Sequence, residues 1–530
     1  MKEIRQIIGY DDLATGKQTF YSRNPSRIEH NEALIYKATS AEAGIAAELA
    51  ETAFQLYRKK SGLEKAAFLE AIAAEIEASG DELISTCMSE TALPRPRIEG
   101  ERGRTIGQLK MFASLLKEGS WVDARIETAL PDRVPLPKPD LRFMNIPLGP
   151  VVVFGASNFP LAFSVAGGDT ASALAAGCTV IVKAHPAHPA TSAIVGKAIQ
   201  TAARKTNMPD GVFSLLFDDG IEIGMELVRH PLIKAVGFTG SFKGGKAIYD
   251  AAVRRPEPIP VYAEMGSSNP VFILPKAAKE KGKQISEGYA ASLTLGVGQF
   301  CTNPGMLIYE QPDNELIGLL KDAFQKTTGG VMLAPYIFEA YNKTLLERQA
   351  VPGVEKAAAG NAPATSEQNL GQPVLFSATG KVLKEHPSLA EEIFGPSGIA
   401  IATDTKEELL GIARDLSGQL TATVHGSEDE LIAYRELLDI LEQKAGRVII
   451  NAFPTGVEVC SAMVHGGPFP ATTDSKTTSV GTAAIYRFVR PVCYQNMPQS
   501  LLPAELQDHN PTAISRMVDG VRQTAGLNNR

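Results

Sequence analysis

The chain has 530 residues, of which 44% are hydrophobic and 21% charged, a composition typical of soluble globular proteins with roughly two to four domains. The net charge of −7, without a run of Lys and Arg interleaved with aromatic residues, argues against a nucleic-acid partner. The five cysteines are widely spaced and form no C-x-x-C pair, so we expect neither a disulfide framework nor a metal site. Since no stretch is apolar enough to span a membrane, we expect a cytoplasmic protein without a membrane partner.

Two amphipathic helices are predicted between residues 40 and 79, where alanine and larger apolar residues recur at helical spacing. The proline-rich segment 129–150 cannot be helical. After it, short apolar runs alternate with helical patterns, first from "VVVFGASNFP" to "GVFSLLF" and again from "PVFIL" to "RVIINAFP". This alternation predicts an α/β fold with two parallel-sheet halves that divide near residue 265.

A glycine-rich turn within "VGFTGSFKGGKAIYD" resembles a phosphate-binding loop, but Ala247 stands where that motif needs a Ser or Thr to coordinate Mg²⁺. An apolar run precedes the glycines and a helical pattern follows them. The turn could therefore present backbone N–H groups to a phosphate, or it could be a strand-to-helix connection without a ligand. A phosphotransferase of the P-loop class is disfavoured.

Several chemically useful residues follow predicted strands or helices. Cys301 lies in "GVGQFCTNPG", where nearby backbone N–H groups could favour its thiolate, although most single cysteines are structural. Glu264 lies in "VYAEMGSSNP", Asn158 in "FGASNFP", and Glu392 and Phe394 in "EEIFGPSG". Their occurrence together favours a catalytic role for Cys301 as a nucleophile.

These segments resemble the aldehyde dehydrogenase superfamily. The resemblance extends over nearly the whole chain, because the Asn-Phe-Pro turn, "IVKAHP", "FTGSFKGG", "AEMGSSNP", "GQFCTNPG", "EEIFGP" and "NAFPTGVEV" occur in the family's order. Within the family, "KAHPAHPATS" and the segment from "VCSAMVHGGPFP" to "VCYQN" are most similar to α-ketoglutaric semialdehyde dehydrogenases. The resemblance implies oxidation of α-ketoglutaric semialdehyde to 2-oxoglutarate. Succinic or glutaric semialdehyde and fatty aldehydes are the alternative substrates.

The resemblance also implies catalytic roles. Cys301 would attack the aldehyde, Asn158 would stabilise the oxyanion, and Glu264 would activate the water that hydrolyses the thioester. A glutamate at position 264 argues against an acylating, coenzyme-A-dependent relative.

The family's cofactor contacts match six residues of this chain. Lys183 and Glu392 would bind the two riboses of the dinucleotide, and Phe394 would lie beside the nicotinamide ribose. The turn residues Gly240, Ser241 and Gly245 would lie beside the pyrophosphate, which makes Lys246 a surface residue. Because "KAHP" lacks an acidic residue after the lysine, NADP is the expected cofactor, with NAD also accepted.

A substrate carboxylate needs a cationic partner, for which the segment "TALPRPRIEGERGRT" supplies Arg97 and Arg104. A solvated helix end is the alternative for either arginine. His465 in "MVHGGPFP" corresponds to a position near the family's substrate entrance, and a packed histidine is the alternative there.

The expected architecture is an aldehyde-dehydrogenase-like α/β fold with a modified Rossmann cofactor domain, an α/β catalytic domain and a small β arm for oligomerisation. The domain boundaries that follow are 1–122 and 148–265 for the cofactor domain, 266–470 for the catalytic domain, 123–147 and 471–495 for the arm, and 496–530 for a C-terminal tail. A homodimer or homotetramer is expected, with a small-molecule aldehyde as the partner.

Overall fold

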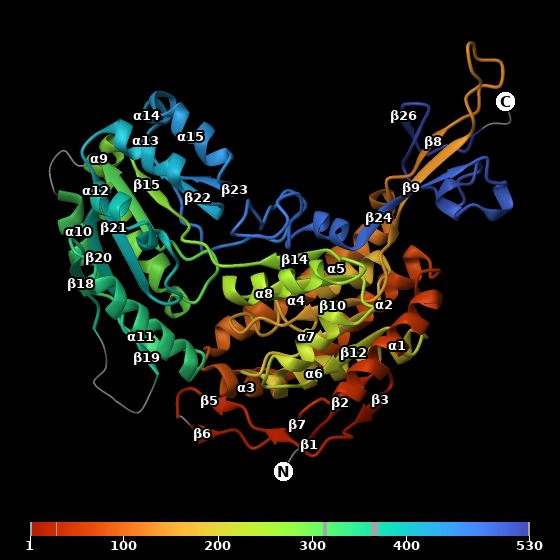
Figure 1. Ribbon diagram of the computed structural model, residues 1–530, viewed down its shortest axis with the longest axis horizontal. Coiled ribbons are helices and arrows are strands. Elements are labelled where there is room, and N and C mark those ends of the chain that lie inside the picture. Colours follow the sequence, from red (N-terminus) through yellow and green to blue (C-terminus); the bar gives the residue numbers. More distant parts are fainter. Residues whose placement is uncertain (1–2, 28, 311–314, 362–368, 528–530) are drawn as a thin grey trace.

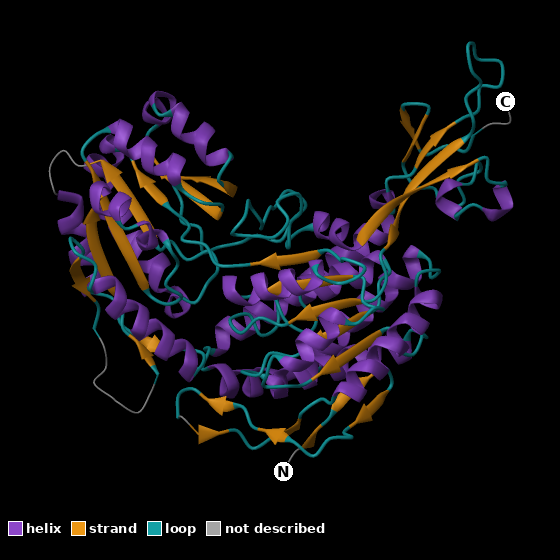
Figure 2. Cartoon of the chain, viewed as in Figure 1, coloured by secondary structure: helices purple, strands orange, loops and turns teal. Residues whose placement is uncertain are grey.

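The computed structural model describes residues 3–27, 29–310, 315–361 and 369–527. Two α/β bodies lie side by side, and a narrow β arm extends away from the first of them (Figure 1). Strands run through the centre of each body, and helices cover them (Figure 2).

The first body is built on a seven-stranded sheet in the order β14-β13-β10-β11-β12-β2-β3, whose first five strands are parallel. In chain order, the strands are β2 (Gln6–Ile8), β3 (Asp11–Leu13), β10 (Val151–Phe154), β11 (Val180–Lys183), β12 (Phe213–Leu216), β13 (Ala235–Thr239) and β14 (Val261–Glu264). Since β10, β11 and β12 are buried along their length, their continuous apolar runs fit a sheet that is covered on both faces.

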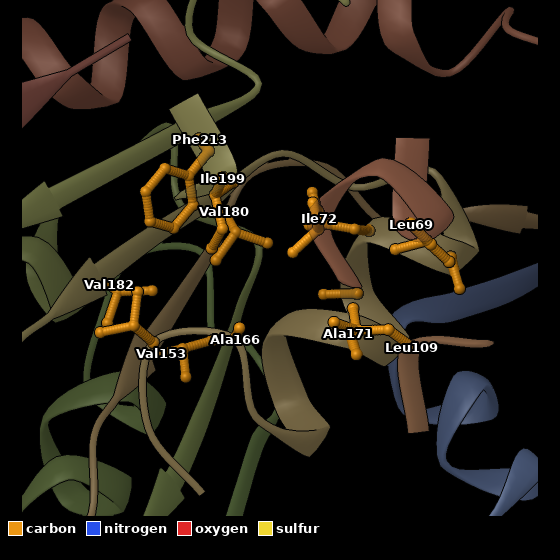
Figure 3. Packing of buried hydrophobic residues seen from close by; sticks show 14 of the residues in the cluster. Leu69, Ile72, Leu109, Val153, Ala166, Ala171, Val180, Val182, Ile199 and Phe213 are labelled. Atoms are coloured by element: carbon orange, nitrogen blue, oxygen red, sulfur yellow. The ribbon is translucent and has the colours of Figure 1, made fainter. Parts of the chain in front are cut away.

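Eight helices pack around this sheet: α1 (Ser40–Tyr57), α2 (Gly62–Ala78), α3 (Gly80–Thr91), α4 (Arg95–Glu118), α5 (Gly168–Ala176), α6 (Pro189–Lys205), α7 (Glu222–Arg229) and α8 (Phe242–Val253). The two helices predicted between residues 40 and 79 are confirmed as α1 and α2, and each begins with a capping box. Side chains from α2, α4 and α6 meet those of β10 to β12 in one dry core (Figure 3).

The second body has its own seven-stranded sheet in the order β18-β20-β21-β16-β15-β22-β23, in which only β18 is antiparallel to its neighbour. Its strands are β15 (Val271–Ile273), β16 (Met306–Glu310), β18 (Glu355–Ala359), β20 (Val374–Thr379), β21 (Ser397–Thr403), β22 (Gln419–His425) and β23 (Ala445–Ile450). Its helices are α9 (Pro275–Thr294), α10 (Glu315–Gln325), α11 (Pro335–Gln349), α12 (Gly380–Glu385), α13 (Lys406–Asp415), α14 (Glu428–Ala433) and α15 (Arg435–Glu442). Between the first and second sheets the chain crosses over directly after β14.

The arm is a five-stranded sheet in the order β24-β9-β8-β25-β26. Its strands are β8 (Arg125–Glu127), β9 (Leu141–Pro147), β24 (Val489–Gln495), β25 (Arg516–Val518) and β26 (Val521–Gln523). The tail therefore continues the arm's sheet, since β25 pairs with β8 in parallel. Short strands form three further small sheets: β1 (Glu3–Ile4) with β7 (Leu34–Tyr36) and β4 (Thr19–Phe20), β5 (Arg23–Asn24) with β6 (Glu29–His30), and β17 (Gly330–Val331) with β19 (Leu370–Gly371).

The structure differs from the predicted start of the arm's second segment at residue 471. The backbone of Ala471 and Thr473 bonds to the chain at the end of β14, so this stretch is anchored inside the first body. "TAAIYRF" then forms a 3₁₀ helix, η4 (Thr482–Phe488), and only β24 after it enters the arm. The sequence predicts this segment as part of the arm, but η4 packs against α5.

Among the residues that the structure describes, no helix combines the length and apolar character needed to cross a membrane.

Candidate active site

Cys301 lies where two cavities meet. Helix α9 ends in a short 3₁₀ turn, η2 (Leu295–Gly298), in which Gly296 and Val297 have left-handed backbone angles, and the chain then turns to present Cys301. A cleft of about 2110 Å³ and a smaller cavity of about 240 Å³ are both lined by this cysteine. The thiol is partly exposed, so a small molecule can reach it.

The backbone of the nucleophile loop contacts the loop after Phe394 directly. Gly298 has a φ of +65°, and a Cβ there would lie 2.3 Å from the carbonyl of Gly395. Asn303 also donates its side-chain amide to that carbonyl at 3.2 Å. A side chain at position 298 would force the two loops apart.

His465 connects the thiol to a carboxylate. Its Nε2 is 3.3 Å from the Sγ of Cys301, and its Nδ1 is 3.1 Å from Oε2 of Glu264. The imidazole is buried, which by itself lowers its pKa, but Cys301 and Glu264 outweigh that effect and raise the pKa of His465 to about 10. His465 is therefore a packed histidine, the alternative considered from the sequence, but it packs between Cys301 and Glu264. An imidazole between a thiol and a carboxylate is an arrangement suited to nucleophilic catalysis.

Glu264 ends β14 and is 1% exposed. Its second oxygen, Oε1, accepts a hydrogen bond of 2.5 Å from Nη2 of Arg487. The same guanidinium contacts Oδ1 of Asp169 at 3.2 Å and donates from Nε to Thr477. Both oxygens of the glutamate are thus engaged by cationic or protonated partners.

Asn158 lies in the loop after β10 and lines the same cleft as Cys301. Its side-chain amide donates one hydrogen bond of 3.0 Å to the carbonyl of Gln299, two residues before the cysteine. Because an amide nitrogen has two N–H groups, one of them remains available for an oxyanion.

Five of the six cofactor-side residues predicted from the sequence line the larger cleft. The exception is Gly245, which is buried in α8, where a Cβ would lie 2.7 Å from the sulfur of Met265. Ser241 caps α8 by accepting from the N–H of Gly244, so the turn joins β13 to the positive end of a helix. Lys246 forms an ion pair with Asp250 at 2.6 Å, which confirms it as a helix-surface residue and removes support for a triphosphate site.

Lys183 stands at the end of β11, and its Nζ donates to the carbonyl of Asp218 at 2.6 Å. Burial lowers the pKa of Lys183 to about 8, against the opposing influence of Asp218, Asp219 and Glu222. The proximity of these three acids to Lys183 could not be predicted from the sequence, because they lie in the connection between β12 and α7 and at the start of α7.

Glu392 faces the same cleft from the loop before β21. Removal from water raises the pKa of Glu392 to about 8, although a backbone hydrogen bond from Ser267 acts in the opposite direction. A Cβ at Gly266 would lie 2.2 Å from its Oε2, so only glycine lets the carboxyl group occupy this place. Phe394 is half-buried against the core of the first body.

The smaller cavity is lined by both predicted arginines of α4. Arg97 forms an ion pair with buried Glu101 at 3.1 Å, and its guanidinium lies 4.4 Å from the ring centre of Phe159. Arg104 stacks 5.5 Å from Phe163, and its Nε and Nη2 are buried without a hydrogen-bond partner among the described residues. Burial lowers the pKa of Arg104, which nevertheless remains a cation. Neither arginine is a solvated helix end.

The family model for the aldehyde dehydrogenase family matches residues 13–476. The chain belongs to the aldehyde dehydrogenase family. This aldehyde dehydrogenase is 50% identical to α-ketoglutaric semialdehyde dehydrogenase 2 of Azospirillum brasilense, with 97% of this chain and 98% of the relative covered. It is 46% identical to the α-ketoglutaric semialdehyde dehydrogenase of Acinetobacter baylyi, with 98% of each chain covered.

Solved structures with low sequence identity have the same fold. A 1-pyrroline-5-carboxylate dehydrogenase from Thermus with bound NAD superimposes with a TM-score of 0.77 at 24% identity, with 93% of each chain covered. Lactaldehyde dehydrogenase from Escherichia coli gives 0.80 at 20% identity, covering 93% of this chain and 99% of that one. The expected fold class is confirmed.

Sequence reasoning missed Arg487 and Asp169, two members of the buried network behind the nucleophile. Asp169 opens the small-residue helix α5, where an acid in the first turn is ordinary. Arg487 was hidden in a segment assigned to the arm. The one available signal was an arginine within the otherwise apolar run "AAIYRF", because such a charge is rarely buried without partners.

Proposed function

We propose that the enzyme oxidises α-ketoglutaric semialdehyde to 2-oxoglutarate with a nicotinamide dinucleotide. The names of the two relatives at 50% and 46% identity support the substrate. The observation that carries the proposal is the place of Cys301 between a wide cleft and a small cavity with two arginines. An aldehyde carbon at the thiol would have its carboxylate in the cavity and its hydrogen toward the cleft.

In the first step, the thiolate of Cys301 forms a bond to the aldehyde carbon, and the carbonyl oxygen takes the negative charge. The free N–H of the Asn158 amide and the backbone N–H of Cys301 are the donors proposed for that oxygen. His465 is proposed to take the thiol's proton on Nε2, which lies 3.3 Å from the sulfur, so that a thiolate meets the substrate. The bound cofactor supplies a hydride acceptor, and loss of hydride leaves a thioester on Cys301.

Hydrolysis of that thioester needs a base. Glu264 is the base implied by the family resemblance, yet its oxygens contact Arg487 and His465. A second candidate is His465 itself, oriented by Glu264 on Nδ1 and facing the sulfur with Nε2. After thioester formation the imidazolium loses its thiolate partner, so it can release its proton and accept another from water.

The cleft fits a dinucleotide. The capped turn of Gly240, Ser241 and Gly245 offers the N-terminus of α8 to a pyrophosphate. Lys183 and Glu392 line the same cleft and would hold the two riboses, and Phe394 would lie beside the nicotinamide ribose. One buried oxygen of Asp218 lacks a partner among the described residues, as expected of a group near a ribose hydroxyl.

NAD is proposed as the preferred cofactor, with NADP accepted more weakly. From the sequence, acceptance of NADP followed from the missing acid after Lys183. In the structure, Asp218, Asp219 and Glu222 supply negative charge beside that lysine from a different segment. Such carboxylates repel the 2′-phosphate of NADP and can accept a hydrogen bond from the 2′-hydroxyl of NAD.

Arg104 is proposed as the principal partner of the substrate carboxylate. Within the described residues, Nε and Nη2 of Arg104 are buried without a hydrogen-bond partner, whereas Arg97 has only Nε in that state and pairs through Nη1 with Glu101. A buried cation with free donors favours a charge-assisted hydrogen bond to an acid.

The domain division given above, with the second segment of the arm beginning at β24 instead of residue 471, is proposed, as is a homodimer or homotetramer formed through the arm. Light scattering on the purified chain tests the assembly.

The test of function is a panel of kcat/KM values for α-ketoglutaric, succinic and glutaric semialdehydes, pentanal and hexanal, each with NAD and NADP. The proposal requires α-ketoglutaric semialdehyde to be the best substrate. A preference for hexanal would overturn the substrate and keep the reaction class. Rapid mixing of Glu264→Gln tests the glutamate as the base: a burst of reduced cofactor before slow turnover supports hydrolysis assisted by Glu264, and an absent burst places the loss before hydride transfer, where Glu264 acts through His465.

A further inference from the structure

Four buried side chains and the partly exposed nucleophile form a line of contacts that starts at Cys301. Cys301 contacts His465, His465 contacts Glu264, Glu264 contacts Arg487, and Arg487 contacts Asp169. Arg487 and Glu264 are each 1% exposed, and Asp169 is 8% exposed. Charges this deeply buried persist only when each is paired.

We propose that Arg487, supported by Asp169, is a positioning residue that holds Glu264 against His465 and so maintains the Cys301 thiolate in the resting enzyme. The proposal rests on the nucleophilic role of Cys301 and deepens it. Arg487 does not touch the reacting atoms and acts only through Glu264.

The geometry leaves Glu264 one orientation. Nη2 of Arg487 binds Oε1 at 2.5 Å, which turns Oε2 toward Nδ1 of His465. The guanidinium is itself fixed at three points, since Nη1 contacts Asp169 and Nε donates to Thr477. A planar fork with fixed directions can satisfy these acceptors together, whereas a lysine amine cannot reach all of them.

A glycine in the sheet leaves room for the carboxylate of Asp169. A Cβ on Gly237 of β13 would lie 2.8 Å from Oδ2 of Asp169, so the sheet provides a gap for this carboxylate. Burial raises the pKa of Asp169, and Arg487 opposes that rise.

Other charged groups face the same cluster. Burial lowers the pKa of Arg104 and of Arg447, and the charge of Cys301 opposes both shifts. Glu101 and Glu458 also oppose the shift of Arg104. The hydroxyl oxygen of Ser479 also lies 3.1 Å from Nδ1 of His465. None of these groups separates Glu264 from Asp169, so Arg487 is the cation that both carboxylates contact.

The test measures alkylation of Cys301 by iodoacetamide between about pH 5 and 10, which reports the thiolate without substrate or cofactor. In the parent, we expect fast alkylation that changes little from pH 6 to 9. Arg487→Met leaves the carboxylates of Asp169 and Glu264 without the cation between them, so one of them takes a proton. The hydrogen bond between Glu264 and His465 is then weaker. We expect at least tenfold slower alkylation at pH 7 and a midpoint moved upward by at least one pH unit.

Two further variants extend the test, and one of them, Arg487→Lys, keeps it decisive if Arg487→Met does not fold. In the double variant Arg487→Met, Asp169→Asn, only Glu264 keeps a charge, so it can pair with His465 again and alkylation at pH 7 should recover at least threefold over Arg487→Met. Arg487→Lys retains the charge without the fork, and we expect an intermediate rate, at least threefold below the parent.

Arg516→Lys is the matched control, because Arg516 is a fully buried arginine of β25 that binds backbone carbonyls far from the site. It should lower the unfolding temperature and leave the alkylation profile unchanged. Parent-like alkylation in Arg487→Lys, no recovery in the double variant, or an equal change in Arg516→Lys would overturn the proposal. An ordinary thiol profile in the parent itself would instead refute the thiolate assumed in the proposed function.

Discussion

Replacing Arg104 by Met should remove recognition of the substrate carboxylate and leave the chemistry at Cys301 intact. Met keeps an unbranched side chain against the ring of Phe163 but has no charge and no donor. The donors that it removes, Nε and Nη2, make no hydrogen bond within the described part of the chain. The substitution therefore breaks no hydrogen bond of these two nitrogens; it removes the contacts with the aromatic rings and the attraction of Arg104 to Glu101 and Cys301.

The size of the effect follows from one charged hydrogen bond, which contributes about 1.5–3 kcal/mol. At about 1.4 kcal/mol per factor of ten, kcat/KM for α-ketoglutaric semialdehyde should fall roughly 10- to 150-fold. Pentanal has the same chain length and no carboxylate, so its kcat/KM should change less than about threefold by the same reasoning.

Two arginines of the same helix serve as controls. Arg102 donates to the carbonyl of Gly80, away from the cavity, and Arg102→Met should leave both substrates unaffected. Arg97→Met removes the partner of fully buried Glu101, which retains only two backbone N–H donors. Because Arg97 is about one quarter exposed, we expect a loss of about 2–3 kcal/mol in unfolding free energy, below the usual cost of breaking a buried pair.

The assay is steady-state kinetics on both aldehydes, with thermal unfolding of each variant. Equal losses for the acidic and neutral substrates in Arg104→Met would show that the arginine shapes the cavity and does not bind a carboxylate.

Three other expectations concern the nucleophile and the cofactor cleft. Cys301→Ala should abolish aldehyde oxidation while cofactor affinity, measured by fluorescence titration, stays within about threefold; turnover within tenfold of the parent would exclude the covalent route. Glu392 has a pKa raised from 4.5 to about 8, so its contribution to stability is full below pH 4.5 and is lost as pH rises through about 8. Urea unfolding should therefore show a decline over that window that Glu392→Gln lacks, and identical pH dependence in the two proteins would contradict it. Asp219→Asn should raise the NADP to NAD ratio of kcat/KM by about three- to tenfold, with dissociation constants following the same direction, and an unchanged ratio would remove the acids as the cause.

The sequence predicted the elements whose signals are local. Helices α1 and α2 followed from apolar spacing, and the turn before α8 followed from its glycines. Cys301 and Glu264 were singled out because each follows a recognisable helix or strand pattern, and their predicted roles came from the family resemblance.

Long-range pairings carried no local signal. His465 lies 164 residues from Cys301 and 201 from Glu264, and nothing in "MVHGGPFP" indicates which groups its two nitrogens meet. The same applies to the acids around Lys183, which β12 brings beside β11. Residues 471–488 were misplaced because a short apolar run suits a strand, and only packing against α5 decides otherwise.

The direct backbone contact between Gly298 and Gly395 makes the two halves of the active site one mechanical unit. Glu392 and Phe394 lie in the loop that contains Gly395, and Cys301 lies three residues after Gly298. Because the two backbones leave no room even for a Cβ at position 298, we expect a displacement of the first loop to move the second loop with it. A dinucleotide in the cleft would then change the position of the reactive sulfur before an aldehyde enters.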